Sequence, residues 1–176
     1  AISLHYAAGP PLSSDYSVRT LFRYLSNLSS FGGPCGRSST TVLTHYLVNI
    51  NPETVSLVDL YIDLYRIVAG SATLLSRYTA AHTLDQAFLV ELGMRGSEIR
   101  VSVDSTERIA VTDSNITLAG RAGLSIENSA AGAGATTGLH FDSFVAEAFF
   151  SVVTTIAPAP AWSASTGLET TWSVLA

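Results

Sequence analysis

A few side chains in this sequence combine residue types and spacings that could support metal chemistry. His140 and Asp142 lie two residues apart, as metal ligands on one strand do, although Asp142 could instead cap a helix that follows it. His82 and Asp85 have the i, i+3 spacing of two ligands on one helical face. Neither pair has a third ligand at a recognisable spacing. We therefore expect no metal site and no cofactor.

Catalytic groups are equally sparse. Cys35, the single cysteine, is flanked by Gly-Pro and Gly-Arg and could be a loop nucleophile, with Arg37 lowering its pKa, if a histidine approached it. No histidine has a recognisable motif relation to it, so a free, unreactive thiol is the favoured interpretation. Asp59, Asp63 and Arg66 could perform acid–base work from one helical face, but a solvated helix surface has the same composition. We expect no catalytic residue.

Two further patterns concern ligands. The glycines of 132–138 follow a GxGxxxG spacing with no lysine after it, which favours a surface loop over a phosphate-binding loop. Four aromatic residues are candidates for contacts with a carbohydrate or a receptor: Tyr61, Tyr65, Trp162 and Trp172.

Helices are predicted mainly in the first half of the chain. Apolar residues at helical spacing indicate an amphipathic helix over Tyr16–Leu28, and further helices are expected over 83–92 and 142–155. The stretch 51–69 fits a helical stripe and a strand alternation equally well. Asn51 and Pro52 as start signals and Gly70 as a stop favour a helix there.

Strands are predicted mainly in the second half. Alternating apolar residues over Ile99–Val111 predict a β-hairpin, and the ranges Thr40–Ile50, Asn115–Leu118 and Leu124–Glu127 are further strand candidates. The glycine-rich segment Ser29–Ser39 is predicted to be a loop. The expected fold class is α+β, with a helix-rich N-terminal half and a hairpin-rich second half; an all-β sandwich or jelly roll is the alternative.

The expected domain organisation is one globular α+β domain over residues 1–160 and an apolar tail over 161–176 that packs on a neighbouring subunit. No transmembrane span is expected, because the most apolar stretches are short and carry acidic residues. The sequence begins at Ala1 without an initiator methionine or a signal-peptide pattern, which predicts a processed product or a fragment.

The charge content is low. Charged residues make up 13% of the 176 residues, against about 25% in an ordinary soluble domain. The nine basic residues are all arginine and are spread along the chain, the net charge is −5 and the pI is about 5.2. Nucleic-acid binding is therefore not expected, since it requires clustered positive charge.

Three segments resemble the central β-region of ribosome-inactivating N-glycosidase A chains: Phe88–Leu92, Glu98–Asp104 and Ala119–Gly123. This resemblance implies a secreted toxin or enzyme subunit. The sequence departs from the family where its chemistry lies, because Thr106–Val111 lacks the family's tyrosine and Val145–Ser151 lacks the arginine of its catalytic helix. The activity is therefore not transferred, and Glu91 and Glu147 are the residues that would test it.

The shortage of charge, with no catalytic motif, predicts a non-enzymatic, self-assembling structural subunit, because a surface covered by neighbours needs few charges. A viral coat or capsid-decorating protein is the main hypothesis, with copies of itself or other structural subunits as partners. The alternatives are the N-glycosidase-type toxin and a receptor- or carbohydrate-binding module. The expected location is the virion or the extracellular space.

Overall fold

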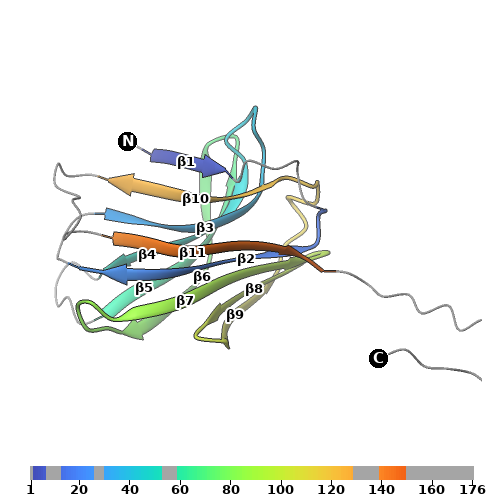
Figure 1. Cartoon of the computed structure of the whole chain (residues 1–176). Coiled ribbons are helices and arrows are strands. Elements are labelled where there is room, and N and C mark those ends of the chain that lie inside the picture. Colours follow the sequence, from blue (N-terminus) through green and yellow to red (C-terminus); the bar gives the residue numbers. More distant parts are fainter. Residues whose placement is uncertain (1, 7–12, 26–29, 53–58, 129–138, 150–176) are drawn as a thin grey trace, which may run out of the picture.

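The computed structural model describes residues 2–6, 13–25, 30–52, 59–128 and 139–149, and these form eleven strands and no helix (Figure 1). The strands are β1 (Ile2–Tyr6), β2 (Tyr16–Tyr24), β3 (Ser30–Ser38), β4 (His45–Pro52), β5 (Asp59–Val68), β6 (Ser71–Ala81), β7 (Ala87–Arg95), β8 (Glu98–Val103), β9 (Thr106–Thr112), β10 (Arg121–Asn128) and β11 (Leu139–Ala148). They form two antiparallel sheets, ordered β1-β10-β3-β4-β5-β6 and β11-β2-β7-β8-β9.

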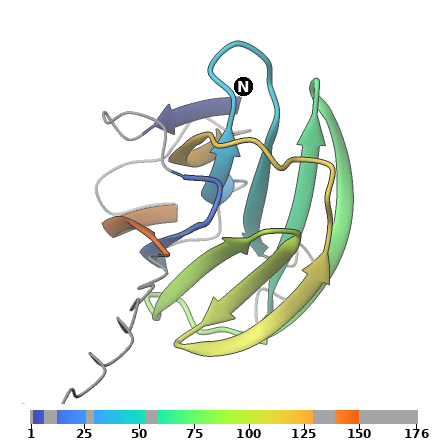
Figure 2. The same cartoon turned by 90° about the vertical axis from the view of Figure 1, so that its right-hand side faces the viewer.

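The two sheets pack face to face as a jelly-roll sandwich. Strands β3 to β6 and strands β7 to β9 form two meanders, one in each sheet. The last two described strands return to the beginning of the chain, because β10 lies between β1 and β3, and β11 pairs with β2. Figure 2 shows β5 and β6 on one side of the molecule and β11 and β2 on the other.

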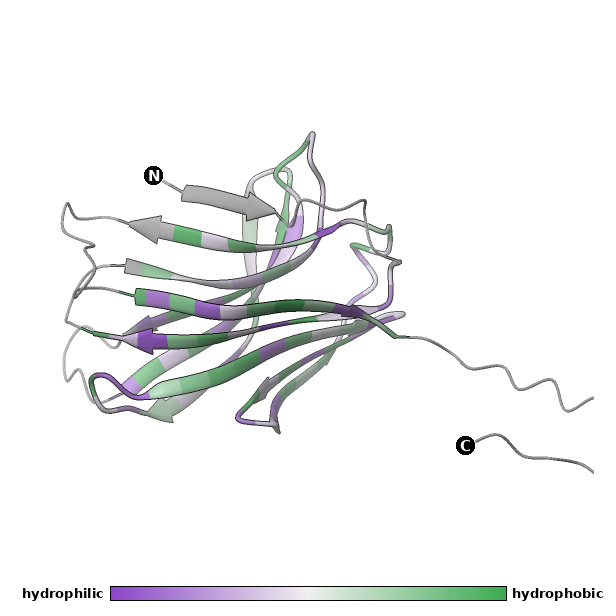
Figure 3. Ribbon diagram, viewed as in Figure 1, coloured by the Kyte–Doolittle hydropathy of each residue, from purple (hydrophilic) through white to green (hydrophobic). Residues whose placement is uncertain are grey.

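The core lies between the sheets and is built by alternation along each strand. In β4 the side chains of Tyr46, Val48 and Ile50 point into it, and in β5 those of Leu60, Ile62 and Leu64 do. Each such burial contributes about 1.5–3 kcal/mol of transfer free energy. Figure 3 shows the resulting change of hydropathy from residue to residue along the strands. The alternation leaves a second face of each sheet directed outward.

The helix-rich α+β prediction is wrong, and the all-β alternative is correct. The predicted helix Tyr16–Leu28 is strand β2 as far as it is described, with an inward set at period two: Tyr16, Val18, Thr20, Phe22 and Tyr24 are all buried. The helical stripe was misleading because Leu21, an apolar residue on the outward side, completes an i, i+3, i+4 pattern.

The stretch 51–69 is a second correction. Asn51 and Pro52 end strand β4 rather than starting a helix, and the strand alternation of β5 is the one that forms. Gly70, predicted to stop a helix, lies in the turn of the β5–β6 hairpin with φ +85°, after Ala69 at +49°. The glycine at positive φ does mark the end of an element, as predicted, but that element is strand β5 rather than a helix.

Three more predictions are wrong in the same direction. The helix expected over 83–92 is a turn followed by β7, and the one expected over 142–155 is β11 as far as it is described. The predicted loop Ser29–Ser39 is strand β3. Its glycines serve close packing, because a Cβ on Gly33 would overlap the carbonyl oxygen of Val48 and one on Gly36 would overlap Met94.

Other strand predictions are confirmed. The hairpin over Ile99–Val111 is β8 and β9, Leu124–Glu127 lies in β10, and Thr40–Ile50 contains β4 from His45 onward. Asn115–Leu118 is not a strand but part of the connection from β9 to β10. Among the described residues, no helix is long and apolar enough to cross a lipid bilayer. The tail over 161–176 lies outside the described residues.

One end of the sandwich is held by a buried arginine. The Arg37 guanidinium donates from Nε to the carbonyl of Ser14, from one terminal nitrogen to Ile116 and from the other to Gly96, each at 2.8 Å. The second terminal nitrogen also lies 3.5 Å from a carboxylate oxygen of Asp15, and the side chain is 0% exposed. The Arg37 backbone N–H donates to the Tyr16 hydroxyl.

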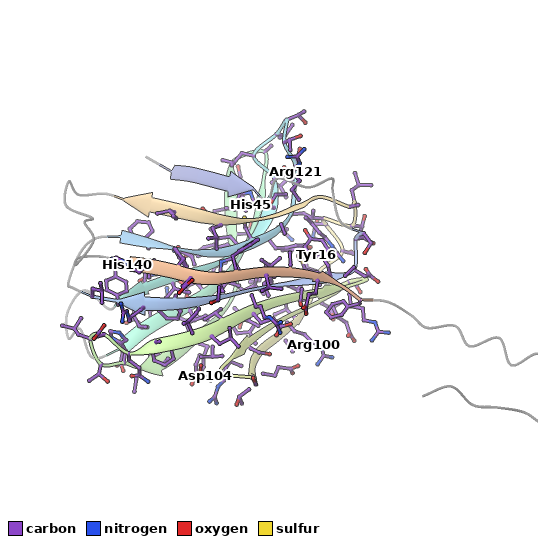
Figure 4. All side chains as sticks on the ribbon, in the orientation of Figure 1. Tyr16, His45, Arg100, Asp104, Arg121 and His140 are labelled. Atoms are coloured by element: carbon purple, nitrogen blue, oxygen red, sulfur yellow. The ribbon has the colours of Figure 1, made fainter. Side chains whose placement is uncertain are left out.

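Asp113 extends this network. It accepts hydrogen bonds from the Tyr46 hydroxyl (2.8 Å), an Arg66 guanidinium nitrogen (2.5 Å) and the Asn115 backbone N–H (2.9 Å). The Tyr46 hydroxyl also accepts from the backbone N–H of Ile116. We call this region, comprising Arg37, Asp113, their partners and the 113–120 connection, the Arg37 end. Tyr16 and Arg121 in Figure 4 mark the same end.

Candidate ligand-binding site

The outward face of the six-stranded sheet contains a pocket of about 290 Å³. Its lining residues come from β10, β3, β4, β5 and β6 and from the loop before β4: Phe31, Leu43, His45, Leu47, Asn49, Tyr65, Ile67, Ala72 and Ser125. On β4 and β5 these are the alternate positions that point away from the core. A single pocket bordered by both β10 and β6 means that this face of the sheet is hollowed.

A charged pair lies beside the pocket. The Arg77 guanidinium of β6 holds the Asp63 carboxylate of β5 with two parallel hydrogen bonds, Nε to Oδ1 at 2.6 Å and a terminal nitrogen to Oδ2 at 2.8 Å. The Asp63 side chain is 1% exposed and that of Arg77 is 44% exposed. The guanidinium also lies over the Tyr61 ring, 4.2 Å from its centroid. Asp63 and Tyr61 thus hold the guanidinium plane in place while much of it stays open to solvent.

Tyr65 connects the pair to the pocket. Its ring lines the pocket, and its hydroxyl donates a long hydrogen bond of 3.5 Å to Asp63 Oδ2. Burial and the neighbouring Asp63 carboxylate raise the pKa of Tyr65, so it remains a phenol at neutral pH. Asn49, a pocket residue on β4, is the register partner of Asp63. We call the continuous surface formed by the pocket, Asp63, Arg77 and Tyr61 the β4–β5 face.

His45 is the unusual residue of this face. It is 1% exposed, yet neither ring nitrogen has a hydrogen-bond partner among the residues that the structure describes. Burial lowers the pKa of His45 to about 4, so the ring is neutral at pH 7. Figure 4 marks its position. A neutral imidazole offers one donor and one acceptor.

Sequence reasoning located part of this face. Tyr61 and Tyr65, named as aromatic candidates, do lie together on the outward side of β5, although both are half-buried. Asp63 and Arg66 point to opposite sides of the strand, since Arg66 bonds Asp113 at the Arg37 end. The predicted helical face of Asp59, Asp63 and Arg66 therefore does not form. Arg77, His45 and Asn49 were missed.

The other candidate residues do not assemble into a site. Cys35 is fully buried in β3, and burial raises the pKa of its thiol to about 12, which agrees with the predicted unreactive thiol. His82 is buried against Tyr24 and Phe88, while Asp85 pairs with Arg23.

His140 and Asp142 lie near each other on β11 and border one pocket, but Asp142 caps no helix. No group of three potential metal ligands occurs within the described part of the chain. The glycines of 132–138, Trp162 and Trp172 lie outside it. Glu91 on β7 and Glu147 on β11 both neighbour Arg19, which lies on β2 between these strands, on the outward face of the five-stranded sheet. A terminal nitrogen of Arg19 lies 3.3 Å from a carboxylate oxygen of Glu147.

Solved structures resemble this sandwich over most of the chain. The carbohydrate-binding module CBM66 from Bacillus subtilis matches with a TM-score of 0.67 and 15% identity, covering 84% of this chain and 82% of that one. The chain has a galectin-like jelly-roll fold. CG-16, a homodimeric agglutinin from chicken liver, and a toad ovary galectin in complex with thio-digalactose both match at a TM-score of 0.53, with 11% and 13% identity. Both cover 84% of this chain, and 100% and 98% of their own chains.

Sequence comparison adds nothing to this likeness, because no family model and no curated protein matches the sequence. The expectation of a viral coat or capsid-decorating protein, which rests on the low charge content, is corrected: these similar structures are a carbohydrate-binding module, an agglutinin and a galectin, and nothing in the comparison supports a capsid subunit. The toxin alternative also lacks support, because residues 145–148, which correspond to the family's catalytic helix in that resemblance, belong to strand β11.

Proposed function

We propose that this chain is a carbohydrate-binding module whose ligand lies on the β4–β5 face. The fold permits many functions, so the proposal rests on the residues of this face. The names of the similar structures, a carbohydrate-binding module, an agglutinin and a galectin, support the same class of ligand.

The observation that carries the proposal is the Arg77 guanidinium held on Tyr61 and Asp63. A sugar presents hydroxyl groups around its edge and C–H groups on its faces, so a complementary site needs fixed hydrogen-bonding groups next to apolar rings. Arg77 supplies an oriented, half-exposed donor fork. Tyr65 supplies an adjoining ring, and Asn49 an amide that both donates and accepts.

The length of the face fits an oligosaccharide. From His45 to Asn51, which pair with Ile67 and Tyr61 on β5, there are six residue steps. At about 3.4 Å per residue this is about 20 Å, which exceeds one pyranose ring. The pocket occupies one end of this length, and the Arg77 pair lies toward the other.

The test is a glycan array followed by calorimetric titration of the best saccharide with wild-type protein and the Arg77→Lys variant. Lysine keeps the charge but loses the planar fork, so we expect the affinity to fall by about tenfold or more. Arg108→Lys is the matched control, because Arg108 also stacks on a tyrosine, Tyr78, at 5.0 Å but lies outside this face. It should leave the affinity unchanged.

Two results would contradict the proposal. One is a wild-type protein that binds no saccharide on the array. The other is binding that Arg77→Lys and Tyr61→Leu both leave intact. Thermal unfolding of each variant shows whether a loss of affinity reflects a loss of fold. An extracellular location and self-association through the tail remain predictions, to be tested by cell fractionation and by light scattering.

A further inference from the structure

The pocket on the β4–β5 face has a composition that limits its occupant. The lining side chains contain no charged group, and most are apolar: Phe31, Leu43, Leu47, Tyr65, Ile67 and Ala72. The hydrogen-bonding side chains are those of His45, Asn49 and Ser125, besides the Tyr65 hydroxyl. At about 290 Å³ the volume is at the lower end of the range for ligand pockets, which suits a single ring.

Burying His45 reduces the stability of the fold, and no hydrogen bond to its ring within the described residues compensates for this loss. A buried polar atom with no partner reduces the folding free energy, and His45 has two such nitrogens while an apolar ring of similar shape would have none. The residue also lacks an ion pair among the described residues. An unsatisfied buried group in a native structure calls for an explanation, and at the wall of a pocket a bound ligand can supply the missing partner.

A charged occupant would lose its hydration without gaining a counter-charge, since no charged side chain lines the pocket. A purely apolar occupant would leave the nitrogens of His45 unpaired. The occupant must therefore be neutral and must combine a hydroxyl group with an apolar surface.

We propose that this pocket is a subsite for a neutral 6-deoxyhexose unit, with His45 bonding a ring hydroxyl and the methyl group lying against the apolar side chains. This inference rests on the proposed carbohydrate-binding function. A hexose with a 6-hydroxyl in place of the methyl would bury a polar group against Leu47 and Ile67 and bind more weakly. His45 is then a specificity-determining residue.

The experiment uses matched sugar pairs that differ only at C6: D-fucose and D-galactose, L-fucose and L-galactose, and L-rhamnose and L-mannose, each as the methyl glycoside. Affinities are measured by titration followed with ¹H–¹⁵N NMR on the full chain. We expect the deoxy member of at least one pair to bind about tenfold more tightly, with shifts at residues of the pocket.

The key variant is His45→Phe. It removes both unpartnered nitrogens, so the free protein should gain about 2–4 °C in Tm, while binding of the deoxy sugar should weaken at least tenfold. His82→Phe is the matched control, because His82 is also buried with an unpartnered nitrogen, Nε2, but lies in the core beside Tyr24 and Phe88. It should leave every affinity unchanged.

The outcomes separate the two proposals. If saccharides bind and Arg77→Lys abolishes binding, but His45→Phe changes neither affinity nor the deoxy preference, the subsite is wrong and the proposed function stands. If His45→Phe lowers the Tm, His45 has a structural role and the inference is also overturned. If no saccharide binds the wild-type chain, the proposed function itself fails and the subsite falls with it.

Discussion

The Arg37 end and the β4–β5 face both contain an arginine with a carboxylate partner, but the two arginines are satisfied differently. At the Arg37 end all three guanidinium nitrogens bond backbone carbonyls of the protein, and the side chain is 0% exposed. On the β4–β5 face Arg77 bonds one buried carboxylate and remains 44% exposed. Nearby, His45 is buried with two nitrogens that have no described partner.

This difference separates a structural site from the proposed binding site. Where the fold itself completes the hydrogen bonding, as around Arg37 and Asp113, substitution should cost stability. Where the fold leaves donors open or unpaired, as at Arg77 and His45, substitution should cost affinity. The comparison can be tested from either side.

The largest expected effect is on the Arg37 end. Arg37→Met leaves three backbone carbonyls without this donor and removes the ion pair with Asp15. We expect the free energy of unfolding, measured by urea titration, to fall by about 3–5 kcal/mol. Arg100→Met is the control: it removes only solvent-exposed pairs with Glu98 and Glu107, which are screened by water, so it should leave the urea midpoint close to that of the wild type. A loss below about 1 kcal/mol for Arg37→Met would contradict the structural role.

A smaller effect is expected on the stability of the fold at low pH, through Asp113. Burial alone would raise the pKa of Asp113, but hydrogen bonds from Asn115, Tyr46 and Arg66 outweigh it and lower the pKa. A lowered folded-state pKa means that the carboxylate stabilises the fold above its unfolded pKa of about 3.9, and that this stabilisation is lost as the pH falls through the folded value.

The urea midpoint of the wild type should therefore fall below about pH 4, and Asp113→Asn should show less of this fall while being less stable at pH 7. Glu98→Gln, at an exposed site on β8, serves as the control and should follow the wild type. Equal pH profiles for wild type and Asp113→Asn would show that Asp113 does not stabilise the Arg37 end through its charge.

The smallest expected effect is an absence of reaction. Cys35 packs against Leu47 and Ile67, two residues that line the pocket. Its raised pKa keeps it a thiol, so the native chain should not react with a disulfide reagent at pH 8, whereas the urea-unfolded chain should react fully. Rapid labelling of the native chain would mean that the floor of the pocket opens to solvent.

Elements that pair with their neighbours along the chain could be predicted from the sequence. Alternation over Ile99–Val111 predicted the β8–β9 hairpin because its two strands are adjacent and paired along the chain. The alternation in β5 also predicts that Tyr61 and Tyr65 share one face, but the start and stop signals around it favour a helix. Asn51-Pro52 and Gly70 mark where an element begins and ends. Such residues do not show whether the element between them is a helix or a strand.

The sequence does not show which side chains on different strands become partners, or which of them are buried. The partner of Asp63 is Arg77 on the next strand. A bulge in the β5–β6 hairpin lies between this pair and the turn, so counting residues back from the turn does not identify Arg77 as the partner. His45 becomes informative only when its burial and its missing partners are known, and no sequence pattern encodes these. At the Arg37 end, the Tyr16 hydroxyl bonds the Gly120 carbonyl across 104 residues.

The return of β10 to the first strands has a consequence for synthesis and folding. Because β10 inserts between β1 and β3, the six-stranded sheet cannot close until residues 121–128 have left the ribosome. Pairings of such large sequence separation slow folding. Until then β3 lacks a neighbour on one side and presents an open edge to other chains. Ser125 of β10 lines the pocket, so the proposed ligand site is completed only when β10 has been added to the sheet, and a nascent chain that lacks β10 has no complete pocket.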